Sequence, residues 1–150
     1  MRVVIQRVTK ALVVIQGTER ASVSSGILIL AGFEDSDDLA DISWMAKKIA
    51  RLRIFDDQNG VMNLSICDVQ GEIMVISQFT LHASTKKGNR PSYIKAAQPE
   101  KAIPLYEEFV IILEREIKKP VKTGVFGANM KVSLVNDGPV TIIIDSKNRE

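Results

Sequence analysis

An uninterrupted apolar run, Gly26 to Phe33 (GILILAGF), constrains the fold of this chain more than any other segment. A run without polar residues is typical of a strand that is buried on both faces. A strand with one solvent-exposed face alternates apolar and polar residues instead. The sheet that contains this strand must therefore have other elements on each side. Because the chain has 150 residues and no visible linker or internal repeat, we expect a single domain, residues 1–150, to supply both layers.

Two helices are predicted. The first follows the N-cap candidates at residues 35–38, and its apolar side chains recur at spacings of three and four, in Leu39, Ile42, Met45, Ile49 and Leu52. The second starts in a segment bracketed by Pro99 and Pro104 and stops at Pro120. Its apolar face consists of Tyr106, Phe109, Leu113 and Ile117.

The remaining segments predict strands. They are the residues 2–8, 10–16, 72–81, 121–126, 130–136 and 140–145, with further short strands around turns at 56–60 and 68–71 and a turn at 17–20. The expected fold class is α+β. We expect mostly antiparallel β-sheets that form a barrel-like or two-sheet core, with the two main helices packed outside.

The ionisable side chains exclude several kinds of chemistry. A single cysteine, Cys67, and a single histidine, His82, give neither an internal disulfide nor a zinc ligand set, so we expect no metal and no cofactor. A Ser-His-Asp or Cys-His system would have to use His82. No apolar run is long enough to span a bilayer, and the N-terminus lacks the apolar core of a signal peptide, so we expect a cytoplasmic protein without membrane contact.

Two polar stretches do not fit a plain sheet. Ser77-Gln78-Phe79-Thr80-Leu81 ends a buried strand, where backbone N–H groups lose their ladder partners and can face a ligand. The alternative is that these polar groups satisfy the following loop. Asn136–Thr141 contains Gly138-Pro139 between two strand-like runs, and from pattern alone it is a tight turn with proline as the first strand residue.

The positive charge is uneven, although the net charge is only +2. A net charge this small does not predict strong nonspecific binding to nucleic acid. Lys86, Lys87, Arg90 and Lys95 nevertheless fall within ten residues that carry no acid, and Lys118, Lys119 and Lys122 form a second group. Each group is either a solvated face or a contact for phosphates.

From end to end, the chain resembles the D-aminoacyl-tRNA deacylase family, first named D-tyrosyl-tRNA deacylases. MRVVIQRV is similar to the start of that family, and the block KIARLRIFDDQNGVMNLSICDVQGEIMVISQFTL is similar throughout, with KKGNRPSY after it. The two signature segments of the family, SQFTL and N-x-G-P-V-T, are intact at residues 77–81 and 136–141.

The resemblance implies a homodimeric hydrolase that cleaves the ester of D-aminoacyl-tRNA and of mischarged glycyl-tRNA. It implies a catalytic segment Ser77, Gln78, Phe79 and Thr80, and a cis Gly138-Pro139 bond that each subunit inserts into the pocket of the other. It also implies that Arg7 supports this dipeptide, that Asn136 supports the substrate pocket, and that the terminal adenosine lies near Phe79, Ala102, Phe126 and Met130. The cations Lys86, Lys87 and Arg90 would then border the pocket and meet tRNA phosphates.

Neither signature contains a histidine or an acid, so the mechanism is an open question at this point. One hypothesis is that the 2′-hydroxyl of the tRNA assists the attacking water while backbone N–H groups near Phe79 and Thr80 stabilise the oxyanion. The competing hypothesis makes Thr80 a covalent nucleophile, which would need a nearby base. A noncatalytic RNA-binding module on the same fold, and an ordinary serine or cysteine esterase, are the alternatives in function.

Overall fold

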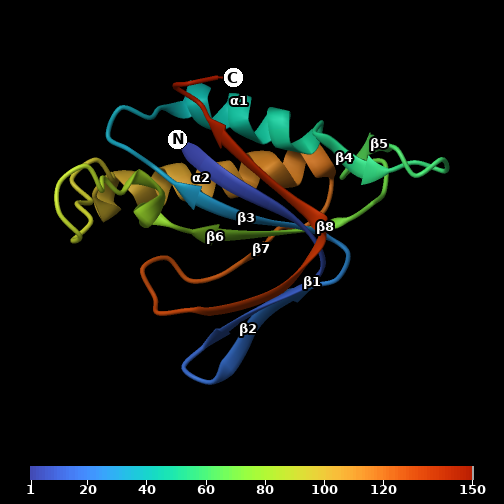
Figure 1. Ribbon diagram of the computed structural model, residues 1–150, viewed down its shortest axis with the longest axis horizontal. Coiled ribbons are helices and arrows are strands. Elements are labelled where there is room, and N and C mark those ends of the chain that lie inside the picture. Colours follow the sequence, from blue (N-terminus) through green and yellow to red (C-terminus); the bar gives the residue numbers. More distant parts are fainter. Residues whose placement is uncertain (150) are drawn as a thin grey trace.

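The structure is a computed structural model that describes residues 1–149. Its main element is one six-stranded mixed sheet (Figure 1). The strands run in the order β2 (Thr18–Val23), β1 (Arg2–Ile15), β3 (Gly26–Gly32), β6 (Glu72–Ser77) and β7 (Lys122–Thr123), and β8 (Lys131–Asp145) pairs with β1. The sheet curves until it nearly closes into a barrel, and both helices lie on one side of it. The predicted α+β class is confirmed.

The central strand β3 has apolar neighbours on both faces, as its uninterrupted apolar run predicts. Ile27 and Ile29 belong to the main core, which lies between the sheet and the helices. Leu28, on the opposite face, packs in a second cluster with Met74 and Val13 inside the curve of the sheet. Burial on two sides therefore fixes β3 as the strand around which the domain is built.

The two predicted helices are α1 (Leu39–Ala50) and α2 (Pro99–Ile117). α1 begins at a capping box, in which Asp38 accepts hydrogen bonds from the backbone N–H groups of Ala40 and Asp41. Leu39 departs from the predicted stripe, because it is the first helical residue and its exposed fraction is 62%. α2 begins at Pro99, within the segment predicted for its start, and Pro104 lies inside the helix.

Two long strands replace pairs of predicted short ones. β1 is continuous where strands at 2–8 and 10–16 were predicted, because its first half pairs with β3 and its second half with β2. β8 is continuous where strands at 130–136 and 140–145 were predicted, because both halves pair with β1. The predicted turn at 17–20 is shorter, with β2 already beginning at Thr18, and β6 ends at Ser77 instead of residue 81.

A small second sheet lies beside the main one. It consists of β4 (Arg53–Asp56) and β5 (Met62–Ser65), joined by the predicted turn, in which Asp57 accepts hydrogen bonds from the backbone of Asn59 and Val61. Within residues 1–149, neither helix is long and apolar enough to cross a membrane.

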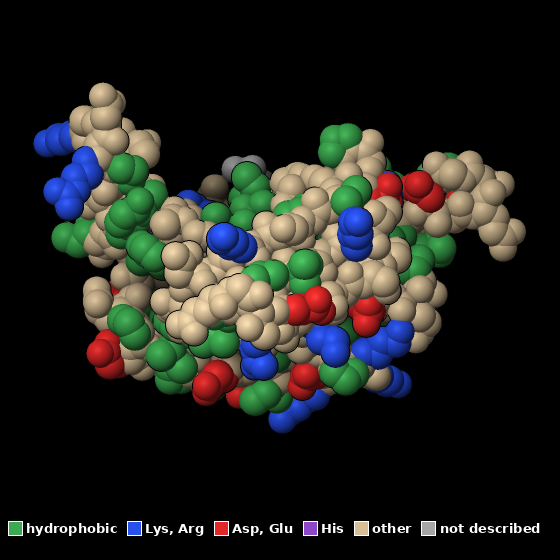
Figure 2. Space-filling view, turned by 90° about the horizontal axis from the view of Figure 1, so that it is seen from below, with side chains coloured by type: hydrophobic (Ala, Val, Ile, Leu, Met, Phe, Trp, Pro, Cys, Tyr) green, Lys and Arg blue, Asp and Glu red, His purple; other side chains and the backbone are tan. Residues whose placement is uncertain are grey.

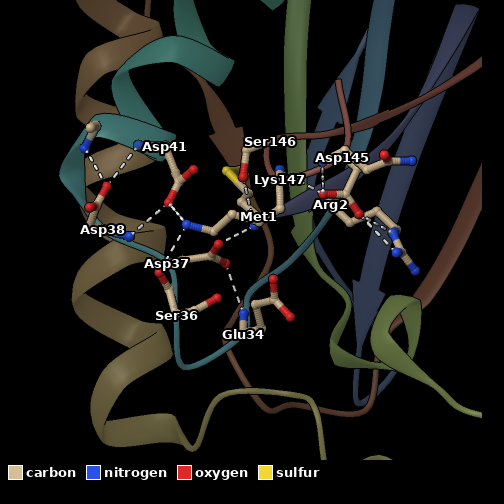
Figure 3. A network of polar contacts seen from close by, with 12 residues as sticks. Met1, Arg2, Glu34, Ser36, Asp37, Asp38, Asp41, Asp145, Ser146 and Lys147 are labelled. Atoms are coloured by element: carbon tan, nitrogen blue, oxygen red, sulfur yellow. Dashed lines mark hydrogen bonds and ion pairs between the residues drawn. The ribbon is translucent and has the colours of Figure 1, made fainter. Parts of the chain in front are cut away.

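Polar contacts tie the two ends of the chain to the start of α1 (Figure 3). The α-ammonium group of Met1 is buried, where it contacts the carboxylate of Asp37 and donates a hydrogen bond to Ser146 Oγ at 2.9 Å. Lys147 donates to Asp41 at 2.5 Å. Burial would raise the pKa of Asp41, but the hydrogen bonds from Lys147 and the helix N-terminus outweigh it and lower the pKa.

Candidate active site

The sheet, α2 and two loops enclose a cavity of about 550 Å³ at one end of the molecule. Four stretches of chain line it, namely residues 31–33, 76–79, 93–102 and 126–132. Figure 1 shows these segments at the left, where β3 and β6 end and α2 begins. The cavity has the size of a small-molecule site, and most of its lining side chains are apolar.

The SQFTL segment forms one wall of this cavity. β6 ends at Ser77, and the chain then turns into the 3₁₀-helix η1 (Phe79–His82). The backbone N–H of Gln78 donates to the carbonyl of Ala31 at 2.7 Å, which holds the turn against β3. Gly32 makes this approach possible, because a Cβ there would lie 2.7 Å from the carbonyl oxygen of Gln78.

The N–H groups of Phe79 and Thr80 begin η1, where a helix has no acceptors for them. Phe79 lines the cavity, so its N–H is available to an oxygen atom of a ligand there, and the N–H of Thr80 follows it in the same turn. The hydroxyl of Thr80 accepts a hydrogen bond from the Gln78 side chain at 2.5 Å, and Thr80 is not among the residues that line the cavity. The hydroxyl of Thr80 is therefore engaged by Gln78 and is not positioned in the cavity as a nucleophile.

Aromatic rings build the back of the cavity. The ring of Tyr106 contacts Phe126 edge to face, with centroids 5.8 Å apart, and Phe33 in the same manner at 6.4 Å. The hydroxyl of Tyr106 donates to the carbonyl of Val75 at 2.9 Å, and burial raises the pKa of this phenol to about 12. Tyr106 therefore stays protonated at neutral pH and cannot serve as a base.

No carboxylate, amine, guanidinium, imidazole or thiol belongs to the described residues that line the cavity, and Tyr93 is their only ionisable side chain. His82 is buried beside Gly32, outside the lining, and its Nε2 has no hydrogen-bond partner in the described part of the chain. Residues 1–149 also contain no group of three His, Cys, Asp or Glu side chains that could hold a metal ion. The cavity thus offers backbone groups, amides and the hydroxyls of Ser77 and Tyr93 for catalysis.

The second signature segment interrupts the pairing of β8 with β1. Gln6 pairs with Thr141 and Val8 with Asn136, so the four residues 137–140 bulge out opposite the single residue Arg7. The Gly138-Pro139 peptide bond is cis, as the family resemblance implied, and Gly138 has a φ of +120°. The predicted hairpin turn is therefore an exposed bulge within one strand.

Side chains on both sides hold this bulge. Asn136 accepts a hydrogen bond from the backbone N–H of Val140 at 3.1 Å and donates to Thr141 Oγ1 at 2.9 Å, which closes the bulge at its base. Arg7 is buried and donates to the carbonyl of Asp137 at 3.2 Å. The guanidinium also contacts the carboxylates of Asp137 and Asp56, at 3.2 and 3.4 Å. The segment is therefore exposed but well anchored.

The structure divides the predicted site residues into three places. Ser77, Gln78, Phe79, Ala102, Phe126 and Met130 line the cavity. Arg7, Asn136, Gly138 and Pro139 lie together at the bulge, and none of them lines the cavity of their own chain. Lys86, Lys87 and Arg90 are exposed on the loop between η1 and α2. In Figure 1, β8 bends at the opposite end of the sheet from the ends of β3 and β6, whose last residues line the cavity.

Several lining residues were not predicted from the sequence. Tyr93 and Gln98 come from the loop before α2, and Asn129 comes from the loop before β8. Tyr93 lies in the block KKGNRPSY, where the cations drew attention and the aromatic residue did not. Only the fold brings these loops to the end of β6.

The family model and the curated relatives agree on one family. A family model described as D-Tyr-tRNA(Tyr) deacylase matches residues 4–145. The D-aminoacyl-tRNA deacylases of Flavobacterium johnsoniae and Flavobacterium psychrophilum are 61% and 65% identical to this chain, with 100% of each chain covered.

Two solved structures are similar as well. The c-Myc DNA unwinding element binding protein superposes with a TM-score of 0.91 at 38% identity, over 97% of this chain and 98% of the other. A structure described as a probable eukaryotic D-amino acid tRNA deacylase has a TM-score of 0.81 at 15% identity, over 95% and 97% of the two chains, and it supports the fold alone.

Proposed function

Because the chain belongs to the D-Tyr-tRNA(Tyr) deacylase family and is a D-aminoacyl-tRNA deacylase, we propose that its cavity binds the aminoacylated 3′-adenosine of tRNA for hydrolysis. The observation that carries this proposal is the wall made by Ser77, Gln78 and Phe79, an intact family signature that lines a cavity of about 550 Å³. Backbone N–H groups there can face the ester carbonyl, while the apolar walls around Phe126 and Ala102 suit an adenine ring.

The selector for handedness in this proposal is Gly138-Pro139 of a second copy of the chain. The bulge is exposed and anchored by Arg7 and Asn136, yet it does not line the cavity of its own chain. A homodimer that inserts each bulge into the opposite cavity would bring the two signatures together. Backbone carbonyls of the dipeptide would then bind the α-ammonium group of the substrate. They would also occupy the space that an L side chain would need.

Selection by exclusion has a consequence for glycine. A D side chain points away from the crowded direction, and glycine has no side chain to exclude. The enzyme would therefore hydrolyse glycyl-tRNA as well as D-aminoacyl-tRNA and spare L-aminoacyl-tRNA. We expect this editing to take place in the cytoplasm, where aminoacyl-tRNA is used.

The proposed mechanism uses the substrate to activate water. The 2′-hydroxyl next to the aminoacyl ester orients or activates a water molecule, which attacks the ester carbonyl. The N–H groups of Phe79 and Thr80 stabilise the oxyanion, and the ester bond then breaks to release the amino acid and the 3′-hydroxyl of the tRNA. The cavity supports this route because its described lining contains no histidine, carboxylate or amine that could act as the base.

The cations of the loop before α2 complete the proposal. In the described part of the chain, the side chains of Lys86, Lys87 and Arg90 form no ion pair. They are available for phosphates of the acceptor end. Replacing Lys86 and Lys87 by Glu should weaken tRNA binding without changing the preference for D over L, whereas a changed preference would put the loop inside the chiral site.

A deacylation assay with one D-aminoacyl-tRNA, its L counterpart and glycyl-tRNA tests the function. Cleavage of the D and glycyl substrates alone is the expected result. Cleavage of none would favour a noncatalytic RNA-binding module, and cleavage of all would contradict chiral selection.

Two variants of that assay test the mechanism. A substrate that ends in 2′-deoxyadenosine should be hydrolysed far more slowly, and undiminished hydrolysis would count against RNA assistance. Thr80→Ala should keep most of the activity, because only its backbone takes part. Complete loss in a folded Thr80→Ala protein that still binds tRNA would restore Thr80 as the nucleophile.

A further inference from the structure

The rim of the cavity carries aromatic and aliphatic side chains that the proposed adenosine site leaves unexplained. Phe79, Tyr93 and Ile94 have exposed fractions of 56%, 39% and 87%. Large apolar side chains rarely stay this exposed in a group unless they meet a ligand or partner. Phe79 and Tyr93 also line the cavity, so the group continues from the cavity to the outer surface.

Tyr93 and Ile94 lie at the base of a cationic loop. The backbones of Ser84 and Ser92 exchange two hydrogen bonds, of 2.8 and 2.9 Å, which close the loop and leave Lys86 to Arg90 at its tip. Figure 2 shows this projecting part at the left edge of the molecule, with Lys and Arg side chains at its tip and hydrophobic side chains beside them. Residues 83–97 contain no acid.

The pairing of the two rings decides how many bases this rim can hold. The rings of Phe79 and Tyr93 meet edge to face, with centroids 5.0 Å apart and an interplanar angle of 73°. A base stacked on one ring cannot also lie flat on the other. If the terminal adenine uses the side of Phe79 that faces the cavity, Tyr93 presents a separate surface, on the chain segment that carries the cations.

Single-stranded nucleic acid is the ligand that fits exposed rings beside unpaired cations. Proteins bind such strands by stacking bases on aromatic side chains while cations follow the phosphates. The end of a tRNA is single-stranded, so the nucleotide before the terminal adenosine must leave the cavity past its rim. An acidic protein surface would meet the cations but would not need a flat aromatic platform.

We propose that Tyr93, with Ile94 beside it, is a stacking platform for the base that precedes the terminal adenosine of tRNA. This inference rests on the proposed function, because it takes the terminal adenosine to occupy the cavity. Tyr93 thereby acts as a binding residue for the strand and keeps the ester in register with Phe79 and Thr80. It would also separate the last two bases of the tRNA, since the two rings are nearly perpendicular.

The test combines a protein change with the removal of one base. Binding of acceptor-end RNA hairpins is measured by fluorescence anisotropy for wild type, Tyr93→Ala and Tyr93→Phe. The hairpins carry the full sequence, an abasic site at the nucleotide before the terminal adenosine, or an abasic site at the terminal position. Ile111→Ala is the matched control, since Ile111 is a similarly exposed apolar side chain on α2 outside the cavity lining.

Tyr93→Ala should weaken binding of the full hairpin between about 5-fold and about 150-fold, the range expected for losing one stacked base. Tyr93→Ala should weaken binding little further when the hairpin already lacks the base before the terminal adenosine. When the hairpin lacks the terminal base instead, Tyr93→Ala should weaken binding by the same factor as for the full hairpin. Tyr93→Phe and Ile111→Ala should bind like wild type. Independent effects of Tyr93→Ala and the preceding base would overturn the inference, and so would coupling to the terminal base instead.

These binding measurements use uncharged RNA and do not depend on hydrolysis. If wild type failed to deacylate D-aminoacyl-tRNA while the coupling was observed, the proposed function would fail and the platform would stand. If wild type deacylated the substrate but no coupling appeared, only the platform would be lost.

Discussion

Replacing Gly138 by alanine perturbs the proposed selector at its most constrained point. Gly138 has a φ of +120°, a region that L side chains rarely occupy, and holding alanine there costs about 1–3 kcal/mol. The added Cβ would also lie 2.9 Å from Val140 Cγ2 and 3.1 Å from Arg7 Nη2. Overpacking of this kind costs about 1–3 kcal/mol more unless the bulge shifts.

Gly17→Ala separates the two effects. Gly17 also has a positive φ, +81°, but a Cβ there would have no atom within 4 Å. This control should lose only the backbone part, about 1–2 kcal/mol in the free energy of unfolding. Urea denaturation should therefore rank Gly138→Ala below Gly17→Ala in stability, with a loss for Gly138→Ala of about 2–6 kcal/mol.

The functional consequence is sharper than the loss of stability. A bulge that moves by about 1 Å no longer holds the α-ammonium group in place, which can lower kcat/KM for D-aminoacyl-tRNA by about 100-fold. Because the carbonyls that exclude an L side chain move as well, the ratio of D to L hydrolysis should decrease. Gly17→Ala should change neither quantity. Equal stability and an equal ratio of D to L hydrolysis for Gly138→Ala and Gly17→Ala would contradict this role of Gly138.

The remaining predictions concern pH and charge. Because no histidine, carboxylate, amine or thiol belongs to the described cavity lining, a break in log kcat/KM between about pH 6 and pH 9 should move with the α-amino pKa of the substrate. A break common to substrates with different α-amino pKa values would indicate an enzyme base. Asp56→Asn, which weakens a carboxylate contact of Arg7, should raise L-aminoacyl-tRNA hydrolysis severalfold, while the neighbour Asp57, which only holds its own turn, should tolerate the same change. An equal increase in L-aminoacyl-tRNA hydrolysis for both substitutions would show that Arg7 does not support the selector. The lowered pKa of Asp41 means that its contact with Lys147 stabilises the fold above the pKa of an unfolded aspartate and is lost as pH falls below about 4. Unfolding experiments in that range should show a smaller fall in stability for Asp41→Asn than for wild type, and an identical fall would contradict this.

Local patterns predicted the elements whose burial is continuous or periodic. Gly26–Gly32 is buried on both faces, and the two helices follow their apolar spacing, so each was predicted from its own residues. β8 was not, because Gly138-Pro139 usually ends a strand, and only pairing of both halves with β1 shows that the strand continues. Such pairing depends on contacts more than a hundred residues apart in the chain, which no local pattern contains.

The candidate site shows the same division. The two signature segments were recognisable because each is short and continuous, at 77–81 and 136–141. The structure then separated them, with one in the cavity wall and the other on an exposed bulge. Tyr93 could not be placed at the rim from sequence, because its position depends on how the loop before α2 closes between Ser84 and Ser92.

The central claim is that one active site takes its cavity from one chain and its selector from another. Mixing two defective variants, Phe79→Ala in the cavity and Gly138→Ala in the selector, tests it most directly. After subunit exchange, half of the dimers should be mixed, and each mixed dimer has one site with both parts intact. Deacylation of D-aminoacyl-tRNA should therefore recover to about a quarter of the wild-type rate. Mixed dimers that are no more active than the two separate variants would contradict the claim, because they would place both parts of the site in a single chain.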